Sequence, residues 1–218
     1  MSTLDLVVLV SGSGSNLQSI LDSIRQNKLD ARVRLVVSNR ADAFALERAK
    51  KANVETKVLS HRDHASRAAF DEALVAAVRQ GLAGASNGYV VLAGFMRILT
   101  TTFLDAFPSR VLNIHPSLLP AFPGIRAQQQ AIAHGVRVSG CTVHLVDAGT
   151  DTGRILAQAA VPVLDGDDES TLGARILEQE HRLLPAVLGW LATGKLVIEG
   201  GRPRYHDVVP VLGLAQST

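Results

Sequence analysis

Cysteine is nearly absent from this sequence: its 218 residues contain one, Cys141. No intrachain disulfide can form, and a zinc cluster built from several cysteine thiolates is excluded. Aromatic residues make up 4% of the chain, which is too few for a platform on which nucleic-acid bases stack. We therefore expect a chain that folds by burying an apolar core, with neither disulfides nor a metal.

A strong net charge is also missing. Lys and Arg number 22 against 20 Asp and Glu, a formal net charge of +2, so no field for binding nucleic acid is expected. Apolar runs such as Tyr89–Met96 are far shorter than the ~20 residues of a membrane span. No basic segment precedes the first apolar run, Leu4–Val10. We expect a cytoplasmic protein without a membrane partner.

Apolar runs alternate with helical patterns along the first half of the chain. Buried-strand patterns occupy residues 4–10, 33–37, 54–59 and 89–93, and helical spacing occupies residues 16–24, 43–52 and 66–80. A turn-rich segment, 81–88, precedes the fourth strand. This alternation is typical of βαβ units and predicts a parallel sheet.

The pattern changes after Pro108. A strand over 111–115 precedes a proline-rich loop and a helix around 127–134. Two strand patterns, 138–146 and 154–163, predict an antiparallel addition to the sheet. A long helix over 170–192 follows Asp167 and Asp168, whose carboxylates suit its N-terminal end, and Pro185 is expected to kink it.

The predicted fold class is therefore α/β. We expect a Rossmann-like open sheet that is parallel in its N-terminal half, with antiparallel additions in its C-terminal half and helices on both faces. One domain, 1–218, is expected, with a core of about residues 4–196 and a weakly patterned tail, 197–218.

A glycine-rich turn, Ser11 to Asn16, lies between the first strand and the first helix. Two glycines let the backbone approach a ligand closely, and the free N–H groups that begin a helix favour a phosphate. The spacing is not that of a dinucleotide site, because Leu17 stands where the third glycine would be. A cradle for one phosphate and a tight turn capped by Ser and Asn side chains are equally compatible with this sequence.

Asn113 and His115 share one side of a predicted strand, because residues two apart in a strand point the same way. That strand ends at the carboxyl edge of the parallel sheet, where open α/β folds bind ligands. An Asn amide can donate to a developing oxyanion, and a His can donate as imidazolium or relay a proton. A capped strand end with a surface His is the alternative, which the surrounding His-Pro-Ser-Leu-Leu-Pro sequence disfavours.

Asp151 lies in the loop between the two later strands, among small residues that permit close approach to a ligand. A carboxylate there could orient a nearby His and favour its charged form. An Asx turn is the more ordinary role for a single Asp in a loop.

The sequence gives little support for a cysteine nucleophile or for a metal site. Cys141 is predicted to be a small buried core residue. His61 and His64 form the one close histidine pair, in a charged segment that we expect to be a solvated loop, so no metal site is predicted. The remaining histidines show no grouping: His134, His144, His181 and His206.

These motifs together resemble the folate-dependent formyltransferase family. The matching segments are 8–17, 38–43, 91–99, 113–120 and 140–153, with Gln179–His181 on the last helix, and the resemblance runs over about residues 4–196. His-Pro-Ser-Leu-Leu-Pro, with an upstream Asn and a downstream Asp-x-Gly, is typical of the whole family. The glycine-rich turn with Asn16 and the chain length narrow the resemblance to members that formylate a ribonucleotide.

The resemblance implies transfer of the formyl group of 10-formyltetrahydrofolate, a co-substrate, to the glycyl amine of 5'-phosphoribosylglycinamide in purine biosynthesis, without a metal. Asn113 and His115 are implied to stabilise a tetrahedral oxyanion. Asp151 is implied to keep His115 protonated and to help move the amine proton. The expected partners are these small molecules, and the expected oligomeric state is a monomer or a homodimer.

The resemblance also implies two binding sites. The ribonucleotide would contact Gly14, Ser15, Asn16 and Glu180. The folate would contact Arg67, Met96, Arg97, Ile98, Leu99, Asn113, Asp147, Ala148, Gly149, Thr150 and Asp151.

Other functions stay open from the sequence. A formyltetrahydrofolate deformylase shares the Asn-His-Asp core, but it uses water as acceptor and normally carries an N-terminal regulatory domain, whereas the first strand here begins at Leu4. Methionyl-tRNA formyltransferase needs a further C-terminal domain and a basic surface. A non-catalytic nucleotide-binding module would explain the glycine-rich turn and leave Asn113, His115 and Asp151 without a purpose.

Overall fold

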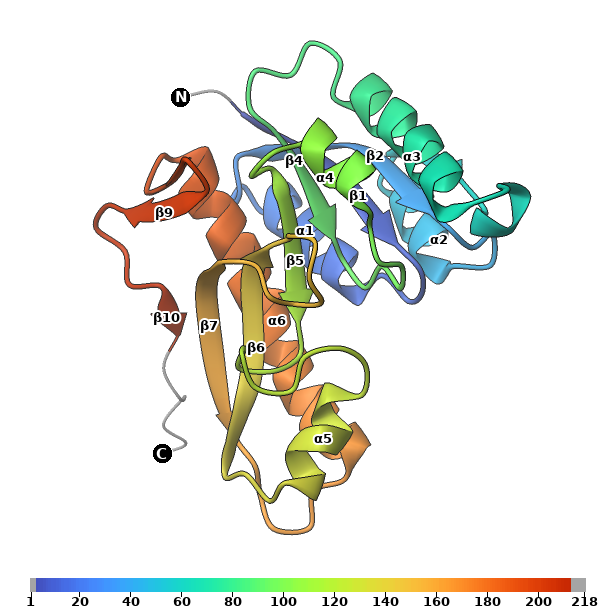
Figure 1. Cartoon of the computed structure of the whole chain (residues 1–218). Helices are drawn as coiled ribbons and strands as arrows, with labels where there is room; N and C mark the ends of the chain where they lie inside the picture. Colours follow the sequence, from blue (N-terminus) through green and yellow to red (C-terminus); the bar gives the residue numbers. More distant parts are fainter. Residues whose placement is uncertain (1–2, 213–218) are drawn as a thin grey trace.

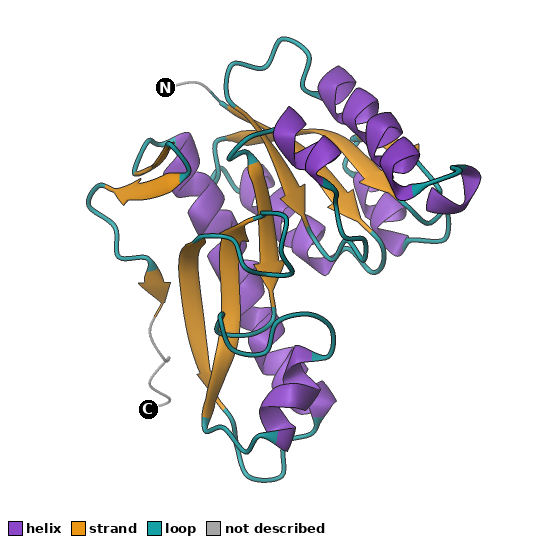
Figure 2. Ribbon diagram, in the orientation of Figure 1, coloured by secondary structure: helices purple, strands orange, loops and turns teal. Residues whose placement is uncertain are grey.

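The computed structural model describes residues 3–212, which fold around an open sheet flanked by helices (Figures 1 and 2). Eight strands in this range form the sheet, in the order β10-β7-β6-β5-β4-β1-β2-β3. The five strands of the N-terminal half pair in parallel, as predicted. They are β1 (Leu4–Val10), β2 (Ala31–Ser38), β3 (Glu55–Val58), β4 (Gly88–Leu92) and β5 (Val111–His115).

The C-terminal half adds the predicted antiparallel strands. β6 (Val138–Leu145) pairs with β5, and β7 (Ile155–Pro162) pairs with β6, both antiparallel. β10 (Val211–Leu212) then pairs in parallel with β7. This arrangement confirms the predicted fold class.

The segment predicted as a weakly patterned tail, 197–218, contains strands that the sequence analysis missed. β8 (Leu196–Glu199) and β9 (Arg202–Tyr205) form a separate antiparallel pair. The Tyr205 hydroxyl donates to Leu156 O on β7 at 2.7 Å and so ties this pair to the sheet. Strands this short show too few alternations to be predicted. Residues 213–218 lie outside the described range.

Helices cover both faces of the sheet, as predicted. Every residue of β1 is buried, and its side chains alternate between two cores. Leu6 and Val8 share the core of one face with α1, α2, α5 and α6, whereas Val7 and Leu9 share the other core with α3 and α4. The helices are α1 (Ser15–Arg25), α2 (Phe44–Lys51), α3 (Arg67–Gly81), α4 (Thr101–Ala106), α5 (Ala127–Ala133) and α6 (Glu169–Ala192). The six-residue α4 was not predicted, because it is too short to show a helical period.

The start of α6 corrects one detail of the sequence analysis. Asp168 alone caps the helix: its Oδ1 accepts from Thr171 N at 2.8 Å, and its own N–H donates to Thr171 Oγ1 at 2.9 Å. Asp167 instead accepts two hydrogen bonds from Arg175, at 2.7 and 2.9 Å, which lower the pKa of its carboxyl. The helix continues past Pro185 to Ala192. Among residues 3–212, no helix is long and apolar enough to cross a membrane.

The order of the strands places a ligand site. From β1 the chain adds β2 and β3 on one side, then returns to add β4 and β5 on the other. The order therefore reverses between β1 and β4, and open α/β sheets bind ligands beyond the carboxyl ends of the strands at such a point. The glycine-rich turn follows β1, and residues 93–100 follow β4.

Candidate active site

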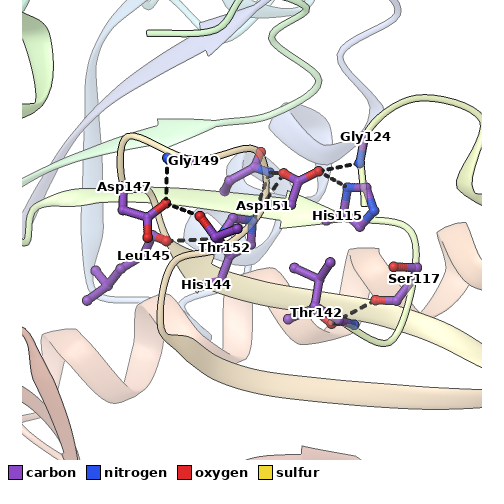
Figure 3. Close-up of polar contacts among 12 residues, drawn as sticks. His115, Ser117, Gly124, Thr142, His144, Leu145, Asp147, Gly149, Asp151 and Thr152 are labelled. Atoms are coloured by element: carbon purple, nitrogen blue, oxygen red, sulfur yellow. Dashed lines mark hydrogen bonds and ion pairs between the residues drawn. The ribbon is translucent and has the colours of Figure 1, made fainter. Parts of the chain in front are cut away.

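The structure brings together Asn113, His115 and Asp151, which the sequence analysis singled out. Figure 3 shows Asp151 directed at His115, with Asp151 Oδ2 3.2 Å from His115 Nδ1. Asn113 Nδ2 lies 3.5 Å from the other oxygen, Asp151 Oδ1. β6 ends beside the first residues of β5, and the loop that follows, residues 146–154, folds back to bring Asp151 beside Asn113 and His115.

Asp151 is held in place by its backbone and by the proline-rich loop. Its φ of 55° lies in the left-handed region, and its Oδ2 accepts from Gly124 N at 2.7 Å. The Asx turn considered for Asp151 is made instead by Asp147, whose Oδ1 accepts from Gly149 N at 3.1 Å and from Thr152 Oγ1 at 2.6 Å (Figure 3). The Asp151 carboxylate is therefore not engaged in an Asx turn, and it faces His115.

Both ring nitrogens of His115 face hydrogen-bond acceptors. The ring is 4% exposed, and its Nε2 lies 2.9 Å from Phe122 O. Its Nδ1 faces the Asp151 carboxylate. A carbonyl and a carboxylate are both acceptors, and a neutral imidazole could donate to only one of them. Only an imidazolium donates to both acceptors at once.

His144 belongs to this cluster, although the sequence analysis found no grouping for it. Its Nδ1 donates to Leu145 O at 2.8 Å, and burial lowers the pKa of its ring, so Nε2 is an acceptor. Asn113 Nδ2 donates to that Nε2 at 3.1 Å. One N–H of Asn113 is thus fixed, while the other makes only the long contact to Asp151. This contact follows from the pairing of β5 with β6, in which residue 113 lies opposite residue 144.

Two side chains hold the proline-rich loop against the sheet. Thr142 Oγ1 donates to Ser117 O at 2.7 Å (Figure 3) and accepts from Leu119 N at 3.1 Å. Gln158 Nε2 donates to Leu119 O at 2.9 Å. These bonds fix the loop that supplies the Phe122 carbonyl and the Gly124 N–H.

A cavity of about 600 Å³ opens beside the cluster, a size that accommodates a drug-sized molecule. Its lining includes nine of the eleven residues predicted to contact folate: Met96, Arg97, Ile98, Leu99, Asn113, Asp147, Gly149, Thr150 and Asp151. Arg67 and Ala148 do not line it. His115 also lines it, and the sequence analysis assigned none of the remaining lining residues, among them Phe95, Gly124, Ile125, Arg126, Gln128 and His144. Met96, Ile98 and Ile125 present exposed apolar side chains, which suit a flat ring.

The glycine-rich turn is uncapped. Gly14 has a φ of 71° and is the residue before α1, and no side chain makes a capping hydrogen bond there. The capped-turn alternative is therefore wrong. A Cβ added to Gly14 would lie 2.5 Å from Ala45 Cβ, so only glycine fits. The first N–H groups of the 11-residue α1 therefore carry no side-chain cap, an arrangement that favours an anion.

Asn16 and Glu180 meet beside this turn. Asn16 Nδ2 donates to Glu180 Oε2 at 2.7 Å across the contact between α1 and α6. Glu180 is 6% exposed, and this burial raises the pKa of its carboxyl, which the bond from Asn16 opposes. Asn16 Oδ1 is buried and has no hydrogen-bond partner within residues 3–212. Among the described residues, the pair therefore leaves one hydrogen-bond acceptor, Asn16 Oδ1, available next to the turn.

The other singled-out residues lie elsewhere. Cys141 is buried on β6, and burial raises the pKa of its thiol. His61 and His64 pack edge-on against Phe70, with ring centroids 6.5 and 5.6 Å apart, so neither is the fully solvated side chain that we expected. The part of the chain that the structure describes contains no group of three or more His, Cys, Asp and Glu that could hold a metal ion.

Known proteins are similar to most of the chain. The formyl transferase family model matches residues 4–188. A phosphoribosylglycinamide formyltransferase of Mycobacterium tuberculosis is 51% identical over 195 residues, 89% of this chain and 88% of that protein. The crystal structure of glycinamide ribonucleotide transformylase 1 from Symbiobacterium toebii has a TM-score of 0.88 and 51% identity, over 93% of this chain and 94% of that one.

A longer relative contains a similar region. The trifunctional purine biosynthetic protein adenosine-3 of Drosophila pseudoobscura pseudoobscura is 49% identical over 193 residues, and the chain spans 14% of its length.

Proposed function

The chain belongs to the formyl transferase family, and from that premise we propose that it formylates the amine of phosphoribosylglycinamide. It is a folate-dependent formyltransferase of purine biosynthesis, and 10-formyltetrahydrofolate is its co-substrate. The observation that carries the catalytic assignment is the convergence of Asn113 and His115 on Asp151 at the edge of the cavity.

The folate occupies the cavity in this proposal, with its formyl carbon beside Asn113 and His115. The segment Met96–Leu99 and the loop Asp147–Asp151 form its walls. Arg67, at the start of α3, contacts the part of the folate that extends beyond the cavity. The phosphate of the ribonucleotide lies on the N–H groups of Gly14, Ser15 and Asn16, and the buried Glu180 carboxyl accepts from the ribose hydroxyls.

The reaction then needs no covalent enzyme intermediate. The neutral glycyl amine attacks the formyl carbon, and the carbonyl oxygen becomes a tetrahedral oxyanion. Asn113 donates its weakly bound N–H to this oxyanion, and the His115 imidazolium supplies positive charge beside it. The carbon–nitrogen bond to the folate breaks as the folate nitrogen takes up a proton, and the amine loses one, so no net proton is released.

Asp151 has two roles in this scheme. Its carboxylate stabilises the imidazolium of His115 through the 3.2 Å contact. It also helps to carry the amine proton toward the leaving folate nitrogen, through a water molecule. Holding both substrates in one site supplies much of the remaining rate enhancement.

We also propose a cytoplasmic monomer or homodimer, built as one formyltransferase domain. A single buried cysteine is consistent with a reducing compartment. The near-neutral net charge is consistent with small-molecule substrates, which would bind to individual groups of the turn and the cavity.

One assay tests the proposed function against its alternatives. Purified protein is mixed with 10-formyltetrahydrofolate, with and without phosphoribosylglycinamide, and released tetrahydrofolate is followed by absorbance. Release that depends on the ribonucleotide is the expected result. Release without it would identify a deformylase, and no release in either mixture would identify a binding module.

A further inference from the structure

The segment that follows β4, residues 93–100, has no helix or strand of its own, yet six of its residues line the cavity. We call it the β4 loop. Side chains from two other elements hold it by hydrogen bonds, one near its middle and one at its end. These two side chains, Ser11 and Asp71, have no part in the proposed chemistry.

Ser11 holds the middle of the β4 loop. Its Oγ accepts from Met96 N at 2.8 Å, and its own N–H donates to Gly94 O at 3.0 Å. The same hydroxyl donates to Asn39 Oδ1 at 2.6 Å, which fixes its orientation. Ser11 is 4% exposed, so water does not compete for these bonds.

Ser11 is also the first residue of the glycine-rich turn. The residue is therefore shared between the two substrate sites: its backbone leads into the phosphate cradle, and its side chain bonds the wall of the folate cavity. An anion that orders residues 12–16 restricts Ser11 and, through one hydrogen bond, Met96. Any such effect must act equally in the reverse direction, because coupling between two binding equilibria is reciprocal.

Asp71 holds the end of the β4 loop. Its side chain is fully buried on α3, and its Oδ2 accepts from both Thr100 N and Thr100 Oγ1 at 2.6 Å. Its Oδ1 has no hydrogen-bond partner among the described residues. A buried carboxylate is costly, and hydrogen bonds to a charged acceptor are the stronger kind. Among the described residues, the hydrogen bonds of Asp71 go to Thr100 and none to the glycine-rich turn, so its effect is assigned to the folate side.

We propose that Ser11 is a positioning residue that couples ribonucleotide binding to folate binding, and that Asp71 is a positioning residue for the folate pocket alone. The inference rests on the proposed function, since it assigns the two substrates to these two sites. It predicts that each substrate tightens the binding of the other in the wild-type protein, by about fivefold or more.

The test measures binding without turnover. Phosphoribosylglycinamide and tetrahydrofolate, which has no formyl group to transfer, are titrated by calorimetry, each in the absence and presence of the other. Ser11→Ala should bring the coupling factor close to one. Asp71→Asn should weaken tetrahydrofolate binding about tenfold and leave both the ribonucleotide affinity and the coupling factor unchanged.

Each residue has a matched control outside the two binding sites. Ser86→Ala removes an exposed hydroxyl from the loop before β4, and Glu72→Gln removes an exposed carboxylate next to Asp71, so both should keep wild-type coupling and folate affinity. Thermal unfolding checks that each variant is folded. If Asp71→Asn is unfolded, Thr100→Val replaces it, because it removes only the Oγ1 bond and should weaken folate binding by a smaller factor.

The outcomes separate this inference from the proposed function. A wild-type protein that shows no ribonucleotide-dependent release of tetrahydrofolate overturns both. An active wild-type protein whose coupling factor is one, or a folded Ser11→Ala variant that keeps wild-type coupling, overturns the inference about Ser11 alone. A folded Asp71→Asn variant with unchanged folate affinity overturns the role of Asp71.

Discussion

The glycine-rich turn and the cluster around Asp151 are built by opposite means. In the turn, the first N–H groups of α1 carry no side-chain cap, and Asn16 Oδ1 is buried without a partner among residues 3–212. In the cluster, Asp151 already accepts from Gly124, and Asn113 already donates to His144. The turn leaves polar groups for a ligand to satisfy, whereas the cluster satisfies its own groups before a ligand arrives.

This difference matches what each region does in the proposed function. A phosphate brings its full charge into the turn, so free donors are enough to bind it. An oxyanion exists only while the reaction proceeds, and donors that must first reorganise would not stabilise it. Substitutions in the cluster should therefore act on kcat, and substitutions in the turn on the KM for the ribonucleotide.

The largest effect is expected from Asp151→Asn, which keeps the shape of the side chain and removes the charge that stabilises the His115 imidazolium. We expect kcat to fall by roughly 10²–10³-fold, and His115→Ala to reach a similar level because the two residues act as a unit. The kcat is measured as the rate of tetrahydrofolate release at saturating concentrations of both substrates. Asp165→Asn is the control, since within residues 3–212 that exposed carboxylate pairs only with Arg137. A kcat within twofold of wild type would contradict the assignment.

A second substitution tests whether the turn is a separate unit. Gly14→Ala introduces a Cβ at a φ of 71° and 2.5 Å from Ala45 Cβ, so the turn must shift. We expect a loss of about 1–2 kcal/mol in the free energy of unfolding and a KM for the ribonucleotide raised at least about tenfold, about 1.4 kcal/mol of binding. Gly12→Ala is the control for stability, because its added Cβ meets no heavy atom within 4 Å. Equal destabilisation by both changes would show that the contact with α2 is unimportant.

Glu180→Gln separates ligand binding from stability in the same region. Burial raises the pKa of the Glu180 carboxyl, so folding already disfavours its charge, and Gln can still accept from Asn16. The midpoint of denaturant unfolding at pH 7 should stay unchanged or rise, while the KM for the ribonucleotide rises about tenfold, near 1.4 kcal/mol. The exposed Glu178→Gln, on the same helix, should change neither. An unchanged KM for Glu180→Gln would remove Glu180 from the ribonucleotide site.

The sequence predicts the turn and the cluster to different extents, for a physical reason. The turn is local: one buried strand, two glycines and a helix pattern lie within a few residues, so its place in the fold follows from short-range order. Asn113 and His115 are also local, because strand alternation puts them on one side. Asp151 joins them only through the return of the chain after β6, which the sequence pattern indicates without fixing its register.

His144 and two backbone groups of the proline-rich loop are contacts of the site that the sequence does not predict. His144 contacts Asn113 because β5 and β6 pair with residue 113 opposite residue 144, and a shift of one residue would turn His144 to the other face. Phe122 O and Gly124 N are backbone groups, which any residue type could supply. Side-chain identity carries no signal for such contacts, so they follow only from the folded loop.

The smallest effect concerns His144, the histidine of the cluster whose pKa is lowered by burial. Burial lowers the pKa of His144 below the value of 6.5 that an unfolded chain would show. As the pH falls below 6.5, the unfolded chain gains a proton that folded His144 does not take up, so this contribution to stability is complete above pH 6.5 and is lost as the pH falls toward the folded pKa. His144→Gln removes the titration and retains an acceptor for Asn113. The unfolding midpoint of the variant should therefore drop less than that of wild type between pH 7 and 5.5.

Other histidines contribute equally to the pH dependence of the wild type and of the variant. Burial also lowers the pKa of His61 and His181, which remain in both proteins and give slopes of the same sign. Only the difference between the two slopes reports on His144. If instead the wild-type midpoint falls less than that of the variant, folded His144 binds its proton more tightly than the unfolded chain does, and its protonated Nε2 faces Asp151 Oδ1, 3.6 Å away, instead of accepting from Asn113. The Asn113 amide would then be oriented by Asp151 alone, and the cluster would no longer be fully arranged before the substrates bind.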